Sequence, residues 1–152
     1  MRAINRIAGI FTTAGFWLWT VQLLLAALYL FAGGFKAFGP AEMLMQNGGG
    51  PVQLPLAFIR FIGYCELAGA LGLILPTLLR IQPRLTPLAA SGLVIIMIGA
   101  TTLMLIEGGV PMAIMPFVAG ALATFVAYGR TTLAPVQPRR AVRVPALVEQ
   151  AA

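Results

Sequence analysis

The chain has 152 residues, of which 60% are hydrophobic and 9% are charged, and its mean hydropathy is +0.94. So few charges cannot cover the surface of a soluble domain, and the composition therefore indicates an integral membrane protein. The formal net charge of +6 is typical of cytoplasmic loops and of contacts with anionic lipid, and we predict no nucleic-acid partner.

Four apolar stretches approach the roughly 20 residues that a helix needs to cross a bilayer. They run from about residue 16 to 38, 58 to 75, 88 to 106 and 110 to 128. Pro76 is predicted to end the second stretch, Pro87 precedes the third, and Pro116 predicts a kink or an irregular first turn in the fourth. The predicted fold is all-α, an integral membrane bundle of four transmembrane helices.

We assign residues 1–130 to this bundle and residues 131–152 to a basic, proline- and arginine-rich tail. Residues 3–15 are predicted to form an amphipathic lead-in. Between the first two spans, the sequence AEMLMQ predicts one short helix, and Gly48, Gly49 and Gly50 argue against regular structure after it.

The basic residues are distributed unequally between the two ends of the spans. Lys36 and Arg60 lie at one end, and the other end has eight, namely Arg2, Arg6, Arg80, Arg84, Arg130, Arg139, Arg140 and Arg143. This asymmetry predicts a multi-pass protein of the bacterial cytoplasmic membrane with both termini in the cytoplasm. In the tail, Arg139, Arg140 and Arg143 are predicted to contact anionic lipid or a partner protein.

The chain has one cysteine, Cys65, and no histidine. A single cysteine excludes an internal disulfide and dithiol chemistry within one chain. The usual protein ligand of haem and zinc and the usual general base are both missing. We predict no metal site and no cofactor that the chain holds by such ligands, so any chemistry depends on Glu, Lys, Arg, Tyr or a partner.

The segment FIGYCELAGALGLILP, residues 61–76, places one carboxylate, Glu66, inside an apolar span. Gly63, Gly69 and Ala70 share its helix face, which predicts that this face is turned to the bundle interior. An ionisable residue inside a membrane is costly and suggests a functional site. Lys36, at the outer end of the neighbouring span, is the predicted partner.

Two other residues lie near this carboxylate in the sequence. Tyr64 can donate a hydrogen bond from a similar depth, and Arg60 is a second cationic candidate, although its spacing from Glu66 places it on a different helix face. The alternative interpretation is structural: a polar clasp, or a neutral Glu66 bonded to a backbone carbonyl. Small residues recur in the second, third and fourth spans as well, and they predict a compact bundle.

Several segments together resemble the DoxX-like family of small membrane proteins. These are LYLFAGGFKAFGP at residues 28–40, FIGYCELAGALGLILP with the Gly63-x-x-Glu66 spacing, TPLAASGLVIIMIGATTL from residue 86, and AYGR at residues 127–130. The resemblance covers roughly residues 22–130 and implies a four-helix membrane protein. Some members are associated with membrane redox systems, including thiosulfate:quinone oxidoreductase and oxidative-stress complexes. Many relatives have a histidine near the end of the third helix, where this chain has Met104 or a neighbour.

Two functions remain open from the sequence. The first is a non-catalytic accessory or assembly subunit of a redox or energy-converting membrane complex, with a membrane-protein partner or a second copy of the chain. The second is a quinone- or lipid-binding component of a membrane oxidoreductase that uses Lys36, Glu66, Tyr64 and Arg60. A closed apolar pocket that reaches Glu66 would favour the second function.

Overall fold

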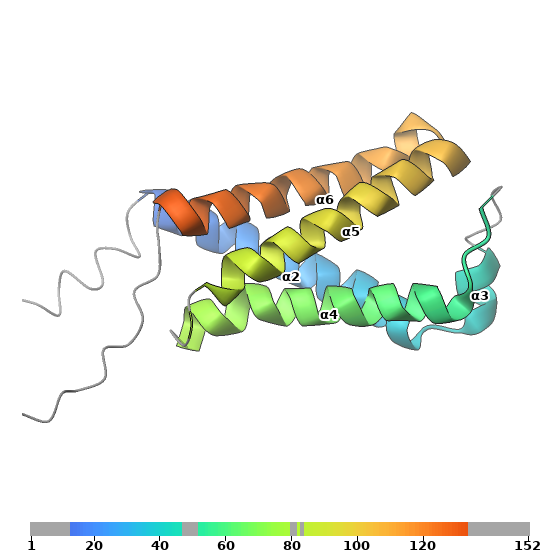
Figure 1. The fold of residues 1–152 in the computed structure, drawn as a ribbon, viewed down its shortest axis with the longest axis horizontal. Helices are drawn as coiled ribbons and strands as arrows, with labels where there is room; N and C mark the ends of the chain where they lie inside the picture. Colours follow the sequence, from blue (N-terminus) through green and yellow to red (C-terminus); the bar gives the residue numbers. More distant parts are fainter. Residues whose placement is uncertain (1–12, 47–51, 80–81, 83, 134–152) are drawn as a thin grey trace, which may run out of the picture.

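The structure of the chain, a computed structural model, describes residues 13–46, 52–79, 82 and 84–133 (Figure 1). All regular structure in these residues is helical. The elements are α2 (Thr13–Phe38), α3 (Ala41–Gln46), α4 (Leu56–Leu79), α5 (Leu85–Glu107), α6 (Val110–Tyr128) and the π-helical turn η1 (Gly129–Leu133). The four long helical segments are long and apolar enough to cross a membrane. The predicted all-α bundle of four membrane-spanning helices is therefore confirmed.

The four long helices form two antiparallel pairs (Figure 1). Helix α2 packs along α4, α5 packs along α6, and the pairs join mainly where α4 contacts α5. Helix α2 begins and α6 ends at the same end of the molecule, whereas α3 lies at the opposite end (Figure 1). We refer to these as the terminal end and the α3 end.

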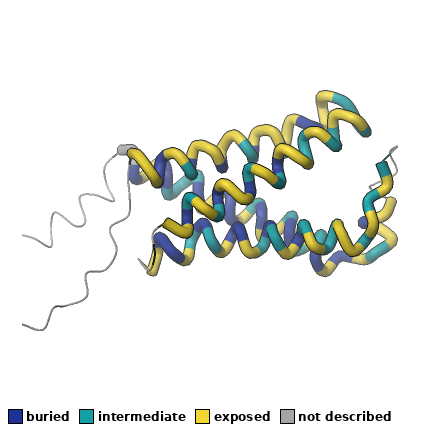
Figure 2. The backbone as a smooth tube through the Cα atoms, viewed as in Figure 1, coloured by how far each residue is buried: buried dark blue, intermediate teal, exposed yellow. Residues whose placement is uncertain are grey.

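Each long helix buries a narrow stripe and exposes the rest of its circumference (Figure 2). On α4 the buried positions follow spacings of three and four residues, and they are Gly63, Glu66, Gly69, Ala70, Leu73, Pro76 and Thr77. Such spacing aligns side chains on one side of a helix. The exposed side chains are large and apolar, for example Phe31 at 79% exposed, as expected where a helix faces hydrocarbon instead of water.

Glycines allow close contact between the helices. A Cβ atom added to Gly69 would lie 2.6 Å from Leu93 Cδ2, and one added to Gly72 would lie 2.6 Å from Ala89 Cβ. On α6, a Cβ at Gly120 would lie 3.0 Å from Met97 Cβ. These distances leave no room for a larger side chain without movement, so the small residues determine how closely the helices pack.

At Pro76 the end of a helix differs from the sequence-based prediction. Helix α4 continues past Pro76 to Leu79, so the prediction that Pro76 ends the helix was wrong. Pro76 lacks the backbone N–H that would bond to the carbonyl of Gly72, and its ring crowds that carbonyl. Membrane helices tolerate such a proline where neighbouring groups compensate. Just beyond it, Thr77 and Thr86 share a buried hydrogen bond of 2.8 Å between their hydroxyls, which ties the end of α4 to α5.

Helix α5 begins at Leu85, before Pro87, because a proline in the first helical turn removes an N–H that has no intrahelical partner anyway. Helix α6 has the predicted bounds and continues through Pro116. The short helix predicted for AEMLMQ is confirmed as α3. The predicted lead-in falls mostly on residues 3–12, and these lie outside the described residues, as do Gly48, Gly49 and Gly50.

Candidate functional site

The candidate site is an ion pair between α2 and α4. Lys36 Nζ donates to Glu66 Oε1 at 2.5 Å. The Glu66 side chain is 1% exposed and the Lys36 side chain is 33% exposed, so the carboxylate is inside the bundle while the lysine side chain is partly exposed near the α3 end. The predicted orientation of Glu66 toward the interior and its pairing with Lys36 are both confirmed.

Two glycines create the space for this pair. A Cβ on Gly33 of α2 would lie 2.9 Å from Glu66 Cβ, and a Cβ on Gly63 of α4 would lie 2.9 Å from the carbonyl carbon of Lys36. Each glycine precedes a charged residue by three positions in its own helix. Because the helices are antiparallel, the glycine of one helix faces the charged residue of the other. The Gly63-x-x-Glu66 spacing noted in the sequence therefore has a counterpart in Gly33-x-x-Lys36.

A buried tyrosine adds a further polar group to this site. Tyr29 lies on α2 one turn before Gly33 and is 1% exposed. Neither its hydroxyl nor Glu66 Oε2 has a hydrogen-bond partner among the described residues, although both atoms are buried. The sequence analysis did not predict a role for Tyr29. Its seven-residue spacing from Lys36 places both side chains on one face of α2, and this spacing could have identified it.

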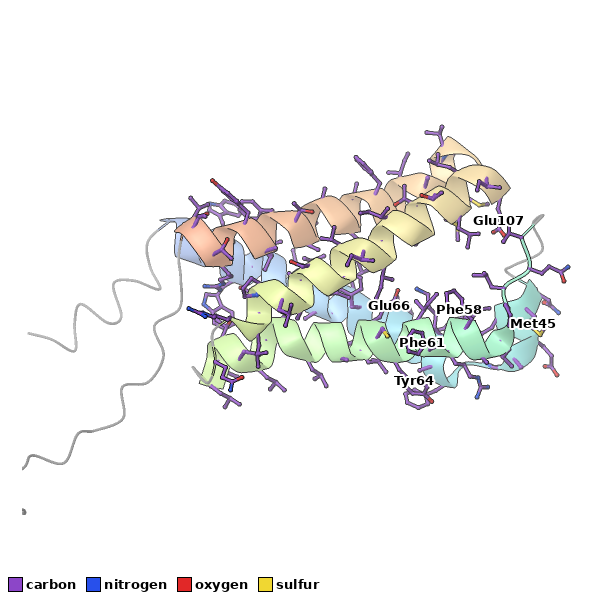
Figure 3. All side chains as sticks on the ribbon, viewed as in Figure 1. Met45, Phe58, Phe61, Tyr64, Glu66 and Glu107 are labelled. Atoms are coloured by element: carbon purple, nitrogen blue, oxygen red, sulfur yellow. The ribbon has the colours of Figure 1, made fainter. Side chains whose placement is uncertain are left out.

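The other predicted site residues do not join the pair. Tyr64 is 50% exposed, packs edge-on against Phe38 at 5.8 Å between ring centroids, and projects from the side of α4 opposite Glu66 (Figure 3). Arg60 is half-buried, and its Nε is buried without a partner among the described residues. The tail residues Arg139, Arg140 and Arg143 lie outside the described part of the chain.

A second polar cluster lies at the terminal end. Gln22 of α2 is completely buried, and its Nε2 donates to the carbonyl of Leu73 in α4 at 2.5 Å. Arg130, in η1, donates from Nε to Gln22 Oε1 at 2.6 Å, and its guanidinium lies 5.2 Å from the centre of the Trp19 ring. This cluster joins α2, α4 and the end of α6.

Sequence reasoning counted Arg130 only as a basic residue of the loops and gave Gln22 no role. The available signal was again periodic: Gln22, Tyr29 and Lys36 recur at seven-residue intervals in a helix whose other residues are apolar apart from two threonines near its start. A polar stripe on one face of a membrane helix is expected to face protein.

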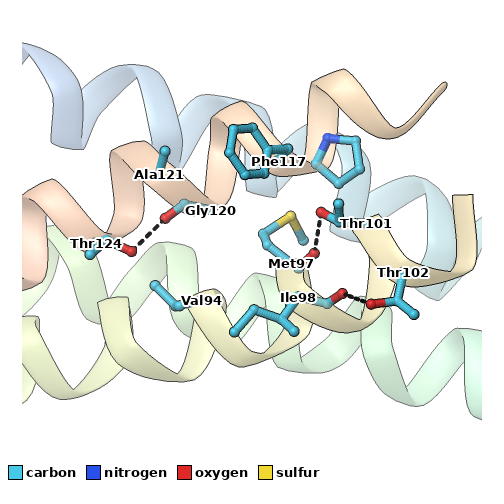
Figure 4. A pocket seen from close by; sticks show the side chains of 10 residues that line it. Val94, Met97, Ile98, Thr101, Thr102, Phe117, Gly120, Ala121 and Thr124 are labelled. Atoms are coloured by element: carbon cyan, nitrogen blue, oxygen red, sulfur yellow. Dashed lines mark hydrogen bonds between the residues drawn. The ribbon is translucent and has the colours of Figure 1, made fainter. Parts of the chain in front are cut away.

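An open groove of about 370 Å³ lies between α5 and α6 (Figure 4). Its lining residues are Val94, Met97, Ile98, Thr101, Thr102, Pro116, Phe117, Gly120, Ala121 and Thr124. The hydroxyls of Thr101, Thr102 and Thr124 each donate to the carbonyl four residues earlier in the same helix. The groove therefore offers mainly apolar contacts, and Glu66 is not part of its lining.

The chain matches a known family of membrane proteins. The model of the DoxX-like family matches residues 20–126, which include α2 from its second turn, the Lys36–Glu66 pair and nearly all of α6. The chain belongs to the DoxX-like family. No curated protein and no solved structure matches it at a significant level. This DoxX-like protein is therefore a multi-pass membrane protein with a buried ion pair in its first helix pair and an open groove in its second.

Proposed function

We propose that this DoxX-like protein is a non-catalytic accessory or assembly subunit of a redox or energy-converting complex in the bacterial cytoplasmic membrane. The observation that carries the proposal is the open surface of the α5–α6 pair. Its groove is apolar and separate from Glu66, while the interior polar side chains bond largely to one another.

Two exposed glycines on α5, outside the lining of the groove, support a protein partner at the neighbouring face of this helix. A Cβ atom at Gly92 or Gly99 would meet no atom within 4 Å, so the packing within the bundle does not require a glycine at either position. A glycine within a helix costs about 0.5–1 kcal/mol relative to alanine. The two positions are seven residues apart and share one helix face. A partner helix that approaches closely there would account for both residues.

The experiment compares Gly99→Leu with a matched change on another helix. Ala68 of α4 is also exposed, so Ala68→Leu adds similar bulk to a surface outside α5 and α6. Each full-length variant is extracted from its native membrane in mild detergent, and the co-purified proteins are measured by quantitative mass spectrometry.

We expect a stoichiometric neighbour with the wild type and Ala68→Leu, and at least a tenfold loss of this neighbour with Gly99→Leu. Equal recovery from all three proteins, or the absence of any stoichiometric neighbour from the wild type, would contradict the proposal.

A specific observation also favours the second function, the binding of a quinone or lipid head group. Lys36 is one-third exposed and an ammonium has three donors, of which Glu66 Oε1 accepts one. The remaining donors suit a carbonyl or phosphate oxygen at the α3 end, with Arg60 on the same end of α4. Extraction of organic molecules from purified protein tests this function: a quinone or lipid retained by the wild type should be lost in Lys36→Met.

A further inference from the structure

We propose that Arg130 forms a phosphate-binding site at the terminal end of the bundle, and that its ligand is the head-group phosphate of an anionic membrane lipid. This site goes beyond both proposed functions. Arg130 contacts the opposite end of α2 from Lys36, and it is not part of the lining of the groove between α5 and α6.

The first argument is a buried positive charge without a counter-charge. Arg130 is 7% exposed, and an arginine keeps its charge in proteins. Within the described residues, the only ion pair joins Lys36 to Glu66, and the other two carboxylates, Glu42 of α3 and Glu107 of α5, lie at the α3 end. A charge removed from water is costly unless it is paired, so an anion at the terminal end would stabilise this arrangement.

The second argument is the geometry of the guanidinium. Its Nε donates to Gln22 Oε1 at 2.6 Å, and its central carbon lies 5.2 Å from the centre of the Trp19 ring. Both contacts are to neutral groups, and together they hold the guanidinium in one orientation. No described residue accepts a hydrogen bond from Nη2. The two terminal nitrogens of an arginine form a planar fork that matches two oxygens of a phosphate.

The third argument is that the local backbone brings this arginine inward. A Cβ atom added to Gly129 would collide with the side chain of Leu18, so the glycine lets the end of α6 approach α2. Residues Gly129–Leu133 form a π-helical turn, a rare conformation that is frequent at functional sites. A neutral amide could also donate to Gln22, and the end of α6 supplies only partial negative charge. Neither contact accounts for a full positive charge at this position.

The position of Arg130 along its helix identifies the source of the phosphate. It lies three residues before the end of the candidate span Val110–Leu133, where the hydrocarbon gives way to lipid head groups. Trp19, beside it, is a residue type enriched at this level. The terminal end also carries the excess of arginines, which attracts anionic lipid. A lipid phosphate is therefore the anion most abundant at the depth of this guanidinium.

Fluorescence of Trp19 tests the proposal, because the guanidinium lies over its ring. Trp17→Phe leaves Trp19 as the only tryptophan of the full chain. The delipidated protein in dodecyl maltoside is titrated with dihexanoyl phosphatidylglycerol, with inorganic phosphate, and with octyl glucoside as an uncharged amphiphile. Arg130→Gln removes the buried charge. Arg84→Gln is the matched control, because it removes an exposed charge at the same end.

We expect phosphatidylglycerol to change the Trp19 emission saturably in the Trp17→Phe protein and in Arg84→Gln, and to bind at least tenfold more weakly to Arg130→Gln. The same lipid should raise the melting temperature of the first two proteins. A saturable change with inorganic phosphate but not with the lipid would support the phosphate site and would place its ligand in the aqueous phase.

The absence of a saturable change with either phosphate compound would overturn the proposal. This titration needs only the Trp17→Phe protein, so it is decisive even if Arg130→Gln does not fold. Equal affinities for the lipid in Arg130→Gln and Arg84→Gln, or the same change of emission with octyl glucoside, would overturn it as well.

Discussion

Glycine and charge are combined in the same way on both helices of the first pair. Gly33 faces Glu66 and Gly63 faces Lys36, so the two backbones approach where the two charges meet. Pairing at 2.5 Å offsets part of the cost of removing the carboxylate from water. The ion pair and the close contact between the helices therefore depend on each other.

Two adjacent glycines of α2 allow a controlled test of this contact. Gly33→Ala would place a Cβ 2.9 Å from both Glu66 Cβ and the carbonyl oxygen of Gly63, whereas Gly34→Ala would place one in open space. We expect Gly33→Ala to lower the free energy of unfolding by about 1–3 kcal/mol through overpacking. Gly34→Ala should leave it unchanged or raise it by up to about 1 kcal/mol.

Thermal unfolding in detergent, followed by circular dichroism, measures both variants. Equal melting temperatures for Gly33→Ala and Gly34→Ala would show that the close approach at Gly33 does not contribute to stability.

At the scale of helices, α2 joins the molecule together through one polar face. Gln22 contacts α4 and Arg130 at the terminal end, Tyr29 lies in the middle, and Lys36 contacts α4 at the α3 end. From Gln22 to Lys36 is about 21 Å along the helix axis. Polar contacts inside a membrane are directional, so this face specifies the rotation of α2 against its neighbours more sharply than apolar packing does.

The contact at the terminal end can be tested through Trp19. Gln22→Leu removes the acceptor of Arg130 and the donor to Leu73, and we expect a loss of about 1–3 kcal/mol in stability. The guanidinium over Trp19 should also move, which changes the emission spectrum of that residue in a Trp17→Phe background.

Thr20→Val is the control, because among the described residues the Thr20 hydroxyl bonds to the carbonyl of Phe16 in its own helix and to no other helix. A Trp19 spectrum that is the same in Gln22→Leu and in the unmutated background would mean that Gln22 does not position Arg130.

For the whole molecule, the excess of basic residues on one side predicts the orientation in the membrane. Cysteine substituted at Gln137 should react only with reagents that enter the cytoplasm, and cysteine substituted at Asn47 should react from outside intact cells. Both are made in a Cys65→Ser background. If an impermeant reagent labelled position 137 from outside intact cells, the C-terminal tail would be outside the cell and the predicted orientation would be wrong.

The basic tail leads to a separate prediction. Deletion of residues 134–152 removes Arg139, Arg140 and Arg143 but keeps η1 and the buried Arg130. We expect the bundle to keep its melting temperature while its binding to anionic vesicles or to a co-purified partner falls. Unchanged binding of both kinds would exclude the predicted role of the tail.

The sequence was sufficient to predict the four spans, because apolar stretches of this length have few alternatives to membrane helices. It also predicted the Lys36–Glu66 contact, since a lone carboxylate in an apolar span needs a partner and one lysine lay at the correct end. Pro76 was misjudged because the end of α4 is set by packing against other helices, including the Thr77–Thr86 hydrogen bond to α5, which local sequence does not encode. Gln22 and Arg130 are 108 positions apart, and only the folded arrangement brings them together.

The central claim is that Lys36 and Glu66 form a coupled pair inside the bundle, and a double-mutant cycle tests it most directly. The free energy of unfolding is measured in detergent for the wild type, Lys36→Met, Glu66→Gln and the double variant. Breaking a fully buried pair costs about 3–5 kcal/mol, and the partial exposure of Lys36 should reduce each single loss to about 2 kcal/mol. We expect the double variant to lose clearly less than the sum of the two single losses. Losses that simply add would show that the two residues are not coupled and would contradict this account of the site.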